Sequence, residues 1–293
     1  MLDPVPSPWL ASPEVLSASR TAPPEGAPGR KELKRMLEDT VDRLADLQRQ
    51  LYAHDRYSVL LVFQALDAAG KDSTIRKVLS GVNPAGCQVH SFKAPSKEEL
   101  DHDFLWRTAK AMPERGRIGV FNRSYYEEVL VVRVHPEYLG GQRLPRGLAD
   151  VGRDRFWEQR LQSIVEHERH LARNGTVILK FFLNVSKDEQ ARRLLARIEN
   201  PEKNWKFNAG DVHEREHWES YQSAFRQAIT ATHAPGAPWY CIPADDKPFM
   251  RYTVADIVVR TLESLPLSWP QLGSEEKKTL DEYAALLKAD LGG

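Results

Sequence analysis

The chain has 293 residues, 41% of them hydrophobic, and its 41 basic and 41 acidic side chains give a formal net charge of zero. This balance argues against a protein that binds nucleic acid through overall charge, so a site for another polyanion would need local clustering. Cys87 and Cys241 stand far apart in no metal-binding spacing, as in proteins of a reducing compartment. We recognise no secretory leader and no apolar run near the ~20 residues that a membrane span needs. We therefore expect a cytoplasmic protein with neither nucleic acid nor membrane as partner.

The composition divides the chain into three parts. Residues 1–29 are rich in Pro, Ser and Ala, which predicts an extended N-terminal arm or a mobile tail. Residues 30–268 carry the regular patterns of one domain, which begins with apolar residues at helical spacing over 31–52. Residues 269–293 predict a last helix, from about 275 to 291, that packs on the core or on a neighbouring subunit.

Strand and helix patterns alternate through the central part. The expected strands are 59–65, 88–92, 118–122, 176–184 and 239–242. The expected helices are 72–80, 97–111, 125–131, 154–173, 187–199, 212–231 and 250–264. This alternation predicts an α/β fold in which a parallel sheet is covered by helices on both faces. Ligands of such sheets bind at the carboxyl ends of the strands.

A short turn of small residues follows the first strand and leads into a helix. Residues 67–71 read Asp-Ala-Ala-Gly-Lys, a layout that brings backbone N–H groups and one ammonium to a phosphate chain. The match to G-x-x-x-x-G-K-[ST] is incomplete, because Ala65 replaces the first Gly and Asp72 the Ser or Thr. Asp67 would repel phosphate unless a metal lies between them. The segment is either a decayed phosphate loop or a variant that binds metal through Asp67; an ordinary βα turn with a solvated Lys71 is the alternative.

A second polar segment follows the strand at 118–122. A phosphate-loop enzyme usually has an acid at this position to face the metal, but this chain has Asn122. Arg123 could bind phosphate oxygens through its planar fork, and Glu127 stands on the first turn of the next helix. The alternative is a polar turn with a surface arginine and a solvated glutamate.

Basic residues gather in a segment that is helical at first and breaks at Asn200-Pro201. Residues 192–206 carry an excess of three positive charges, and the helix that follows carries Arg215. Kinases of small nucleotides use such a helical lid, here about 192–222, to bring arginines over the transferring phosphate and exclude water. A solvated basic helix is the alternative. The charge excess favours a polyanion longer than one triphosphate.

Six segments in this order resemble the polyphosphate kinase 2 family over roughly residues 30–266. They are LDAAGKD at 66–72, GVNP at 81–84, FNRSYYEEVLVVRV at 121–134, RIENPEKNWKF at 197–207, ERxxW at 214–218 and PWYCIPADDKPFMR at 238–251. Asn122 and the EEVLVVRV tail are most similar to the subgroup that phosphorylates both nucleoside monophosphates and diphosphates.

The resemblance implies a P-loop kinase-like three-layer α/β/α fold with a five-stranded parallel sheet and a helical lid. It implies reversible transfer from inorganic polyphosphate to AMP or ADP, with Mg²⁺ or Mn²⁺ as cofactor. Adenine nucleotides would be the acceptors, with guanine nucleotides as a second option, and the chain would assemble as a homodimer or homotetramer.

The resemblance also implies residue roles, which agree with the local patterns. Asp67, Lys71 and Arg123 would be catalytic, and Asp67 and Asn122 would bind the metal. Nucleotide binding is expected at Asp67, Arg76, Asn83, Asn122, Glu127 and Arg133. Polyphosphate binding is expected at Ala69, Gly70, Lys71, Asp72, Ser73, Arg123, Arg193, Arg197, Lys206 and Arg215.

The expected mechanism is in-line phosphoryl transfer that depends on positioning and charge neutralisation. Two other functions remain open at this point. An ATP-dependent nucleoside monophosphate kinase would share the loop, the lid and the fold. A non-catalytic polyphosphate-binding module would explain the altered loop, with Ala65 and Asp72, but not the joint presence of Asp67, Lys71 and Arg123.

Overall fold

Five apolar runs of the chain form the central sheet of the computed structural model, which describes residues 3–145, 147–148 and 153–291. The outermost two residues of the expected arm and of the expected C-terminal segment lie outside this part. The strands are β1 (Ser58–Gln64), β2 (Cys87–Ser91), β3 (Ile118–Asn122), β4 (Thr176–Asn184) and β5 (Trp239–Pro243). All pairs are parallel, in the order β2-β3-β1-β4-β5. The predicted α/β class and its parallel five-stranded sheet are confirmed.

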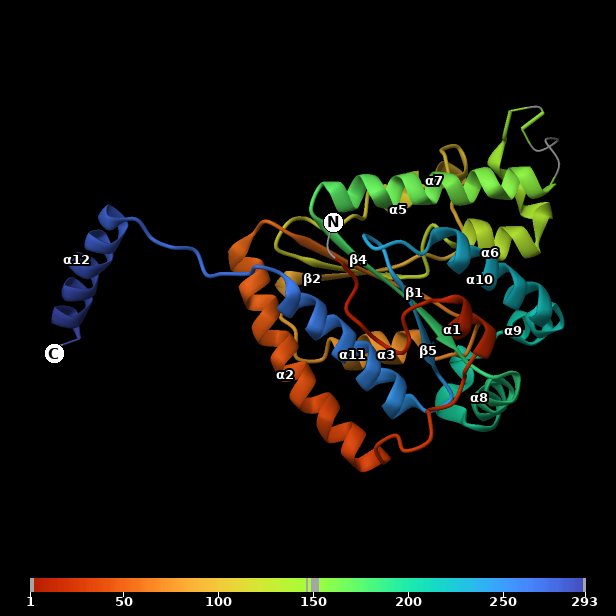
Figure 1. Cartoon of the computed structure of the whole chain (residues 1–293), viewed down its shortest axis with the longest axis horizontal. Coiled ribbons are helices and arrows are strands. Elements are labelled where there is room, and N and C mark those ends of the chain that lie inside the picture. The colour runs from red at the N-terminus through yellow and green to blue at the C-terminus, as the bar shows by residue number, and fades with distance from the viewer. Residues whose placement is uncertain (1–2, 146, 149–152, 292–293) are drawn as a thin grey trace.

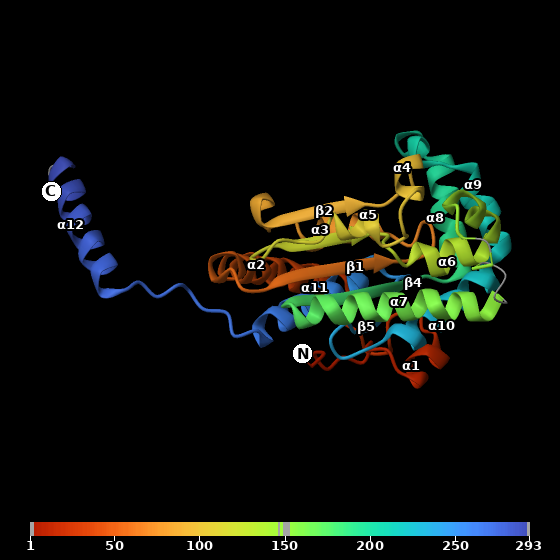
Figure 2. The same ribbon diagram turned by 90° about the horizontal axis from the view of Figure 1, so that it is seen from above.

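Helices cover both faces of this sheet (Figures 1 and 2). One face packs against α2 (Arg30–His54), α3 (Lys71–Val78) and α11 (Lys247–Ser264). The other face packs against α6 (Glu127–Val134), α7 (Arg153–Arg173) and α10 (Trp218–Thr232). Along β1, Leu61 and Phe63 belong to the first core and Leu60 and Val62 to the second, as the two-residue period of a strand requires.

Two of the expected helices are wrong in their extent. The segment 97–111 forms two single turns, α4 (Lys97–Leu100) and α5 (Trp106–Ala109). Between them the Asp103 carboxylate accepts from the Leu105 N–H at 2.9 Å, a local bond that competes with a continuous helix. The segment 212–231 is also interrupted, by a 3₁₀ turn (Glu214–His217) between α9 (Ala209–His213) and α10.

The lid region lies past the carboxyl end of β4. It consists of α8 (Lys187–Glu199), a 3₁₀ turn (Pro201–Lys206) and α9. The break falls at the Asn200-Pro201 step, where the Asn200 side chain caps the 3₁₀ turn by accepting from Glu202 N. Figure 2 shows α8 and α9 together at the end of the molecule to which the strands point.

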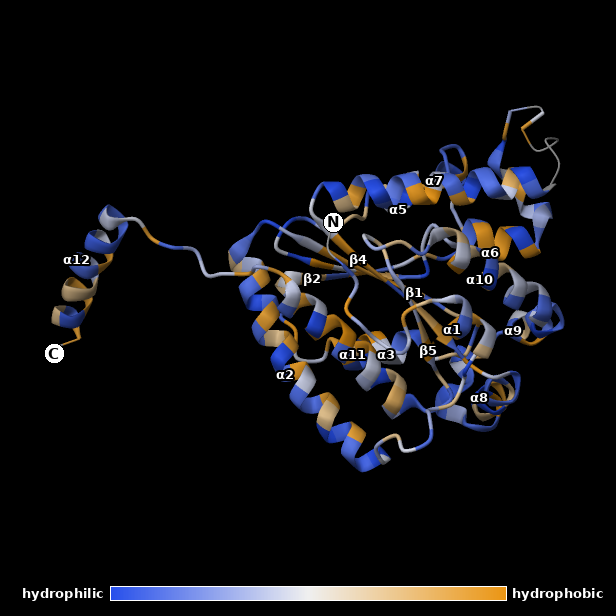
Figure 3. Cartoon of the chain, in the orientation of Figure 1, coloured by the Kyte–Doolittle hydropathy of each residue, from blue (hydrophilic) through white to orange (hydrophobic). Residues whose placement is uncertain are grey.

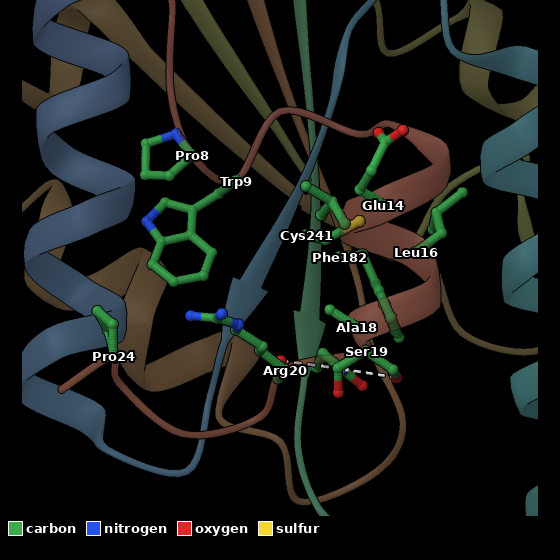
Figure 4. Close-up of a pocket in the computed structure, with 12 residues that line it drawn as sticks. Pro8, Trp9, Glu14, Leu16, Ala18, Ser19, Arg20, Pro24, Phe182 and Cys241 are labelled. Atoms are coloured by element: carbon green, nitrogen blue, oxygen red, sulfur yellow. Dashed lines mark hydrogen bonds between the residues drawn. The ribbon is translucent and has the colours of Figure 1, made fainter.

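Residues 3–29 form an extended arm along the edge strand β5, with a short helix, α1 (Pro13–Ala18). Cys241 N donates to Trp9 O at 2.8 Å and Ala11 N to Trp239 O at 2.9 Å, so the arm pairs with the otherwise open edge. Trp9 is buried and packs edge-on against Phe249, with ring centroids 5.7 Å apart. Between α1 and the sheet lies a cavity of about 370 Å³ (Figure 4).

The C-terminal segment ends in α12 (Ser274–Asp290), which projects away from the rest of the molecule (Figure 1). Figure 3 shows hydrophobic residues on this helix, and Leu280, Tyr283 and Leu287 are all more than half exposed. Among the described residues we find no helix with the length and apolarity that crossing a membrane requires.

Candidate active site

The loop between β1 and α3, residues 65–70, turns sharply at the carboxyl edge of the sheet. Ala68 and Gly70 adopt positive φ angles of 60° and 109°. A Cβ at Gly70 would lie 3.3 Å from Met250 Cε and 3.7 Å from Arg193 Nη1, so glycine suits both the conformation and the space. The Ser73 hydroxyl donates to Gly70 O at 3.0 Å and joins the loop to the first turn of α3. This geometry fits a turn that binds anions through backbone N–H groups.

Lys71 begins α3, and its side chain folds back over the loop. Its Nζ donates to Ala65 O at 2.6 Å and to Leu66 O at 3.3 Å. Burial lowers the pKa of this ammonium, and the nearby Arg123 guanidinium lowers it further, while neighbouring carboxylates oppose the shift. An ionised phosphate oxygen is a stronger acceptor than these two carbonyls, so an incoming phosphate can draw the ammonium to itself.

Arg123 occupies a tight turn directly after β3, with a φ of 64° that is unusual for a residue other than glycine. Its Nη2 lies 2.8 Å from Asp67 Oδ1, and its Nη1 lies 3.2 Å from Glu127 Oε2. These two carboxylates, Glu127 first, raise the pKa of the guanidinium. The structure therefore brings Asp67, Arg123 and Glu127 together beside Lys71, as the sequence led us to expect.

Neighbouring strand ends complete this group with amide side chains. Gln64, the last residue of β1, donates to Glu127 Oε1 at 2.8 Å and is a site residue that the sequence analysis missed. Asn122, the last residue of β3, donates to Asp72 Oδ1 at 2.5 Å. Gln64 and Asn122 both stand at carboxyl ends of adjacent strands, and this position was the signal that could have identified Gln64.

The acids of this group suit a metal that is held partly by substrate. Among the described residues, no group of three or more His, Cys, Asp or Glu side chains could hold a metal ion. Mg²⁺ is commonly bound by one or two carboxylates together with substrate phosphates and water, so this donor set fits Mg²⁺. Of the two carboxylates that pair with Arg123, Asp67 is the better candidate ligand for Mg²⁺. Its side chain is 28% exposed, and its partner Arg123 can turn to phosphate instead.

The lid brings one predicted arginine near the loop. Arg197 Nη1 lies 2.9 Å from Asp211 Oδ2. Burial raises the pKa of the Asp211 carboxyl, and the charge of Asp67 contributes to the rise. Asp211 was not predicted, because its closeness to Asp67 depends on how α9 folds over the sheet edge.

Arg193, another expected polyphosphate contact, lies against the loop itself. Its guanidinium is buried and donates to Ala69 O at 2.6 Å, to Ala244 O at 2.6 Å and to Glu189 Oε1 at 2.8 Å. These bonds use all three nitrogens, so Arg193 braces the phosphate loop against the segment after β5. The polyphosphate contact expected for Arg193 stays a prediction beside this bracing role.

Two further polyphosphate contacts were expected: Lys206 lies in the lid, and Arg215 lies in the 3₁₀ turn directly after α9. Arg215 Nη1 donates to Gln190 Oε1 at 2.7 Å, and Gln190 Nε2 donates to Asp67 O at 3.0 Å, so Arg215 reaches the loop through one intermediate side chain. Lys206 is exposed, and its Nζ lies 4.8 Å from the centre of the Trp205 ring.

Two expected nucleotide-binding residues are not brought to the loop. Asn83 caps the 3₁₀ turn before β2 and therefore lies at the amino edge of the parallel sheet, opposite the loop. Arg133 donates to Gln227 at 2.5 Å and lies over the Trp157 ring, between α7 and α10. The spacing within a motif could not reveal either position, since both depend on how the helices return across the sheet.

A group of basic residues beside the loop was missed. Burial and the charges of Arg193 and Arg251 lower the pKa of Lys247, and burial and the charges of Arg76 and Arg193 lower that of Arg251. Arg251 Nε is buried and has no hydrogen-bond partner among the described residues. Arg76 is exposed on α3 next to this group. Lys247 and Arg251 fall within the segment 238–251 that carries part of the family resemblance.

Comparisons with known proteins show what the chain is similar to. A protein of Rhodopseudomonas palustris named ADP-polyphosphate phosphotransferase is 55% identical over 245 residues, which is 84% of each chain. A protein of Meiothermus ruber named AMP/ADP-polyphosphate phosphotransferase is 46% identical, over 82% of this chain and 85% of that one. The crystal structure of polyphosphate kinase 2 from Arthrobacter aurescens matches with a TM-score of 0.79 and 36% identity, over 89% of this chain and 91% of that one. The family model of polyphosphate kinase 2 matches residues 29–267, and the chain belongs to this family.

Proposed function

We propose that this protein transfers phosphoryl groups from inorganic polyphosphate to both AMP and ADP, with Mg²⁺ as cofactor and in a reversible reaction. Polyphosphate-dependent phosphorylation of a nucleotide is supported by family membership and by the names of the two sequence relatives. Those names differ in whether AMP is included, so the acceptor range is a finer proposal. Asn122 and the helix that begins at Glu127 support acceptance of both nucleotides.

The observation that carries the proposal is the presence of basic side chains on both sides of the loop. Lys71 and Arg123 lie on the side of β3, and Lys247 and Arg251 lie on the side of α11. Burial lowers the pKa of both Lys247 and Arg251, the charge of Arg193 lowers both further, and Arg251 Nε has no hydrogen-bond partner among the described residues. A donor with many linked phosphates would supply negative charge along the surface.

The residues of this site can promote transfer without a strong base. The attacking atom is a phosphate oxygen of the nucleotide, and it is already ionised at neutral pH. The ammonium of Lys71 and the guanidinium of Arg123 would offset charge on the equatorial oxygens of the transferring group, which is the main requirement of phosphoryl transfer. Asp67 and Glu127 would hold Arg123 in position until phosphate displaces them.

Asp67 is the residue that we propose as the protein ligand of Mg²⁺, with Asn122 beside it. When bound, the metal would neutralise charge on the phosphates between which transfer occurs. Gln190 holds the backbone carbonyl of Asp67 at 3.0 Å, which fixes the loop from which this carboxylate extends.

The direct test is to incubate the purified protein with Mg²⁺, polyphosphate and AMP, without ATP, and to follow nucleotides by chromatography. The proposal predicts ADP first and ATP second, and no product when EDTA removes the metal. ADP as the only product would restrict the acceptor to AMP. Activity that appears only after ATP is added would indicate an ordinary nucleoside monophosphate kinase and would contradict the proposed donor.

A matched pair of variants tests the donor surface. Arg251→Gln should raise the KM for polyphosphate because it removes a cation whose Nε lacks a protein partner. Arg260→Gln is the control, since Arg260 lies on the same helix and pairs with Asp256 at 3.6 Å. Equal KM values for polyphosphate in the two variants would exclude the α11 side from donor binding.

A further inference from the structure

A buried polar cluster lies on the face of the sheet that α7 and α10 cover, beneath the turn that carries Arg123. Its centre is Lys180, in the middle of β4, with 0% of its side chain exposed. Lys180 Nζ donates to Glu168 Oε2 at 2.5 Å, to Thr232 O at 2.8 Å and to Tyr126 Oη at 2.9 Å. The three protons of the ammonium therefore have three acceptors, and the charge is paired with Glu168 of α7.

This cluster is joined directly to the β3–α6 turn. The Tyr125 and Tyr126 hydroxyls lie 2.8 Å and 2.9 Å from the same oxygen, Glu168 Oε1. Both tyrosines are buried, and they follow Arg123 by two and three positions in the chain. The Tyr126 ring also packs edge-on against Trp239, with centroids 4.8 Å apart. Glu168 thus holds two consecutive residues of the turn, and Lys180 holds Glu168.

The turn needs such support because its backbone is strained. Arg123 has a φ of 64°, and a residue other than glycine keeps this conformation only when its surroundings impose it. On one side, Arg123 N donates to Phe63 O of β1 at 3.1 Å. On the other side, the anchors are the hydroxyls of Tyr125 and Tyr126. Arg123 lies between these anchors and pairs with Asp67. Glu127 follows Tyr126 directly in the chain.

Stability alone does not account for the buried ion pair. Replacing such a pair by apolar groups of similar volume is often neutral or stabilising, because burial of two charges is costly. The cluster touches none of the groups that we assign to the substrates, so Lys180 and Glu168 have no direct part in the chemistry. The pair fixes the orientation of the two tyrosine side chains, because charged hydrogen bonds constrain them more strictly than apolar contacts do.

We propose that Lys180 and Glu168 are positioning residues that act through Tyr125 and Tyr126 to hold Arg123 and Glu127 in the geometry of phosphoryl transfer. The cluster determines turnover more than it determines substrate binding or folding. This inference rests on the assignment of Arg123 to the reacting phosphates.

The test compares two double variants of the full chain. Lys180→Met with Glu168→Gln removes both charges together and keeps a polar partner for the tyrosine hydroxyls. Ser58→Ala with Thr176→Val is the control, because this pair joins β1 to β4 by a 3.0 Å hydrogen bond at the amino ends of the two strands, away from the turn. For both double variants we would measure thermal unfolding, kcat and the KM values for polyphosphate and nucleotide. Amide hydrogen exchange over residues 121–128 is the fourth measurement.

In the Lys180 and Glu168 variant we expect kcat to fall about 10- to 100-fold, as for small displacements of positioned catalytic groups, with KM values changed less than about threefold. Amide exchange over 121–128 should become faster, while the control keeps the wild-type kcat and exchange. A folded variant with the kcat and exchange of the control would overturn the proposal.

Tyr126→Phe provides a second variant that keeps the ring packed against Trp239 and removes only the hydroxyl. It should lower kcat and accelerate exchange over the same residues, and wild-type values for both would also refute the proposal. The exchange comparison does not require turnover. A failure of the proposed function, seen as an inactive wild type, is therefore distinguishable from a failure of the positioning role.

Discussion

Two charged clusters lie on opposite sides of the β3–α6 turn, and they differ in their access to solvent. In the outer cluster, the side chains of Arg123 and Asp67 are 38% and 28% exposed. In the inner cluster, the side chains of Lys180 and Glu168 are 0% and 3% exposed. In the proposed function, partners in the outer cluster exchange for phosphate or metal, whereas those in the inner cluster have no such competitor. The comparison thus separates the groups that we propose to change partners during the reaction from the groups that we propose to keep the turn in place.

The largest effect should come from removing the ammonium beside the loop. Lys71→Ala should reduce kcat/KM by roughly a thousandfold, because a charge at the transfer point is lost from a partly desolvated site. The unfolding midpoint should change little, since water can replace the bonds to Ala65 and Leu66. Lys77→Ala on the same helix is the control, because Lys77 is exposed. Turnover of the Lys71 variant near the wild-type value would remove Lys71 from the mechanism.

Arg193 and Arg197 provide the next test, because they lie one helical turn apart on α8 and have different surroundings. Arg193→Met should lower the free energy of unfolding by about 2 kcal/mol, since it removes the donor to Glu189 Oε1 and to several buried carbonyls. Arg197→Met should change the KM for polyphosphate and leave the unfolding free energy near that of the wild type. The measurements are denaturant titration and initial rates, and the reverse pattern would favour Arg193 as a ligand contact.

The pH dependence of activity should be sensitive to the surroundings of Lys71. The ammonium is the form that attracts phosphate, and burial lowers its pKa below the ordinary 10.5. The value of kcat/KM, which reports the free enzyme, should therefore begin to fall below that pH as the ammonium is deprotonated. Bound phosphates favour the charged form and raise the pKa again, so kcat should fall at a higher pH than kcat/KM. A profile with the two limbs in the opposite order would disagree with this placement of Lys71.

The smallest effect is expected at the C-terminus. Deleting residues 269–293 should leave the unfolding midpoint unchanged, because none of the residues described in α12 is buried. At the other end of the chain, Trp9→Ala should cost about 3 kcal/mol, since the ring is buried against Phe249. Thermal unfolding of the two variants compares the ends directly, and a clear loss of stability in the deletion would show that α12 has a structural contact.

The five strands and the loop were predictable because their signals are local. An apolar run followed by small residues and Lys71 specifies a strand, a turn and a helix start, and parallel strands bring Asn122 beside the loop. The helix at 97–111 was predicted wrongly because the Asp103 side chain competes for backbone hydrogen bonds there. Helical spacing could not reveal this competition.

The site residues also divide into those that local sequence signals predict and those that depend on contacts between distant parts of the chain. Asp67, Lys71 and Arg123 lie near strand ends, so the sheet topology was enough to bring them together. The protein partners of Arg193 and Lys180 were not predictable, because a positive charge in a helix or a strand does not show which partner it meets. In the first case the partners are carbonyls of the phosphate loop, and in the second they are Glu168 and Tyr126, distant in sequence.

The most direct test of the account follows labelled phosphate from polyphosphate to nucleotide. Wild type and Lys71→Ala are incubated side by side with ³²P-labelled polyphosphate, Mg²⁺ and AMP, without ATP. The account predicts labelled ADP followed by labelled ATP with the wild type, and a strongly reduced yield with the variant. Label that reaches nucleotide at equal rates in both proteins, or does not reach it at all with the wild type, would contradict it.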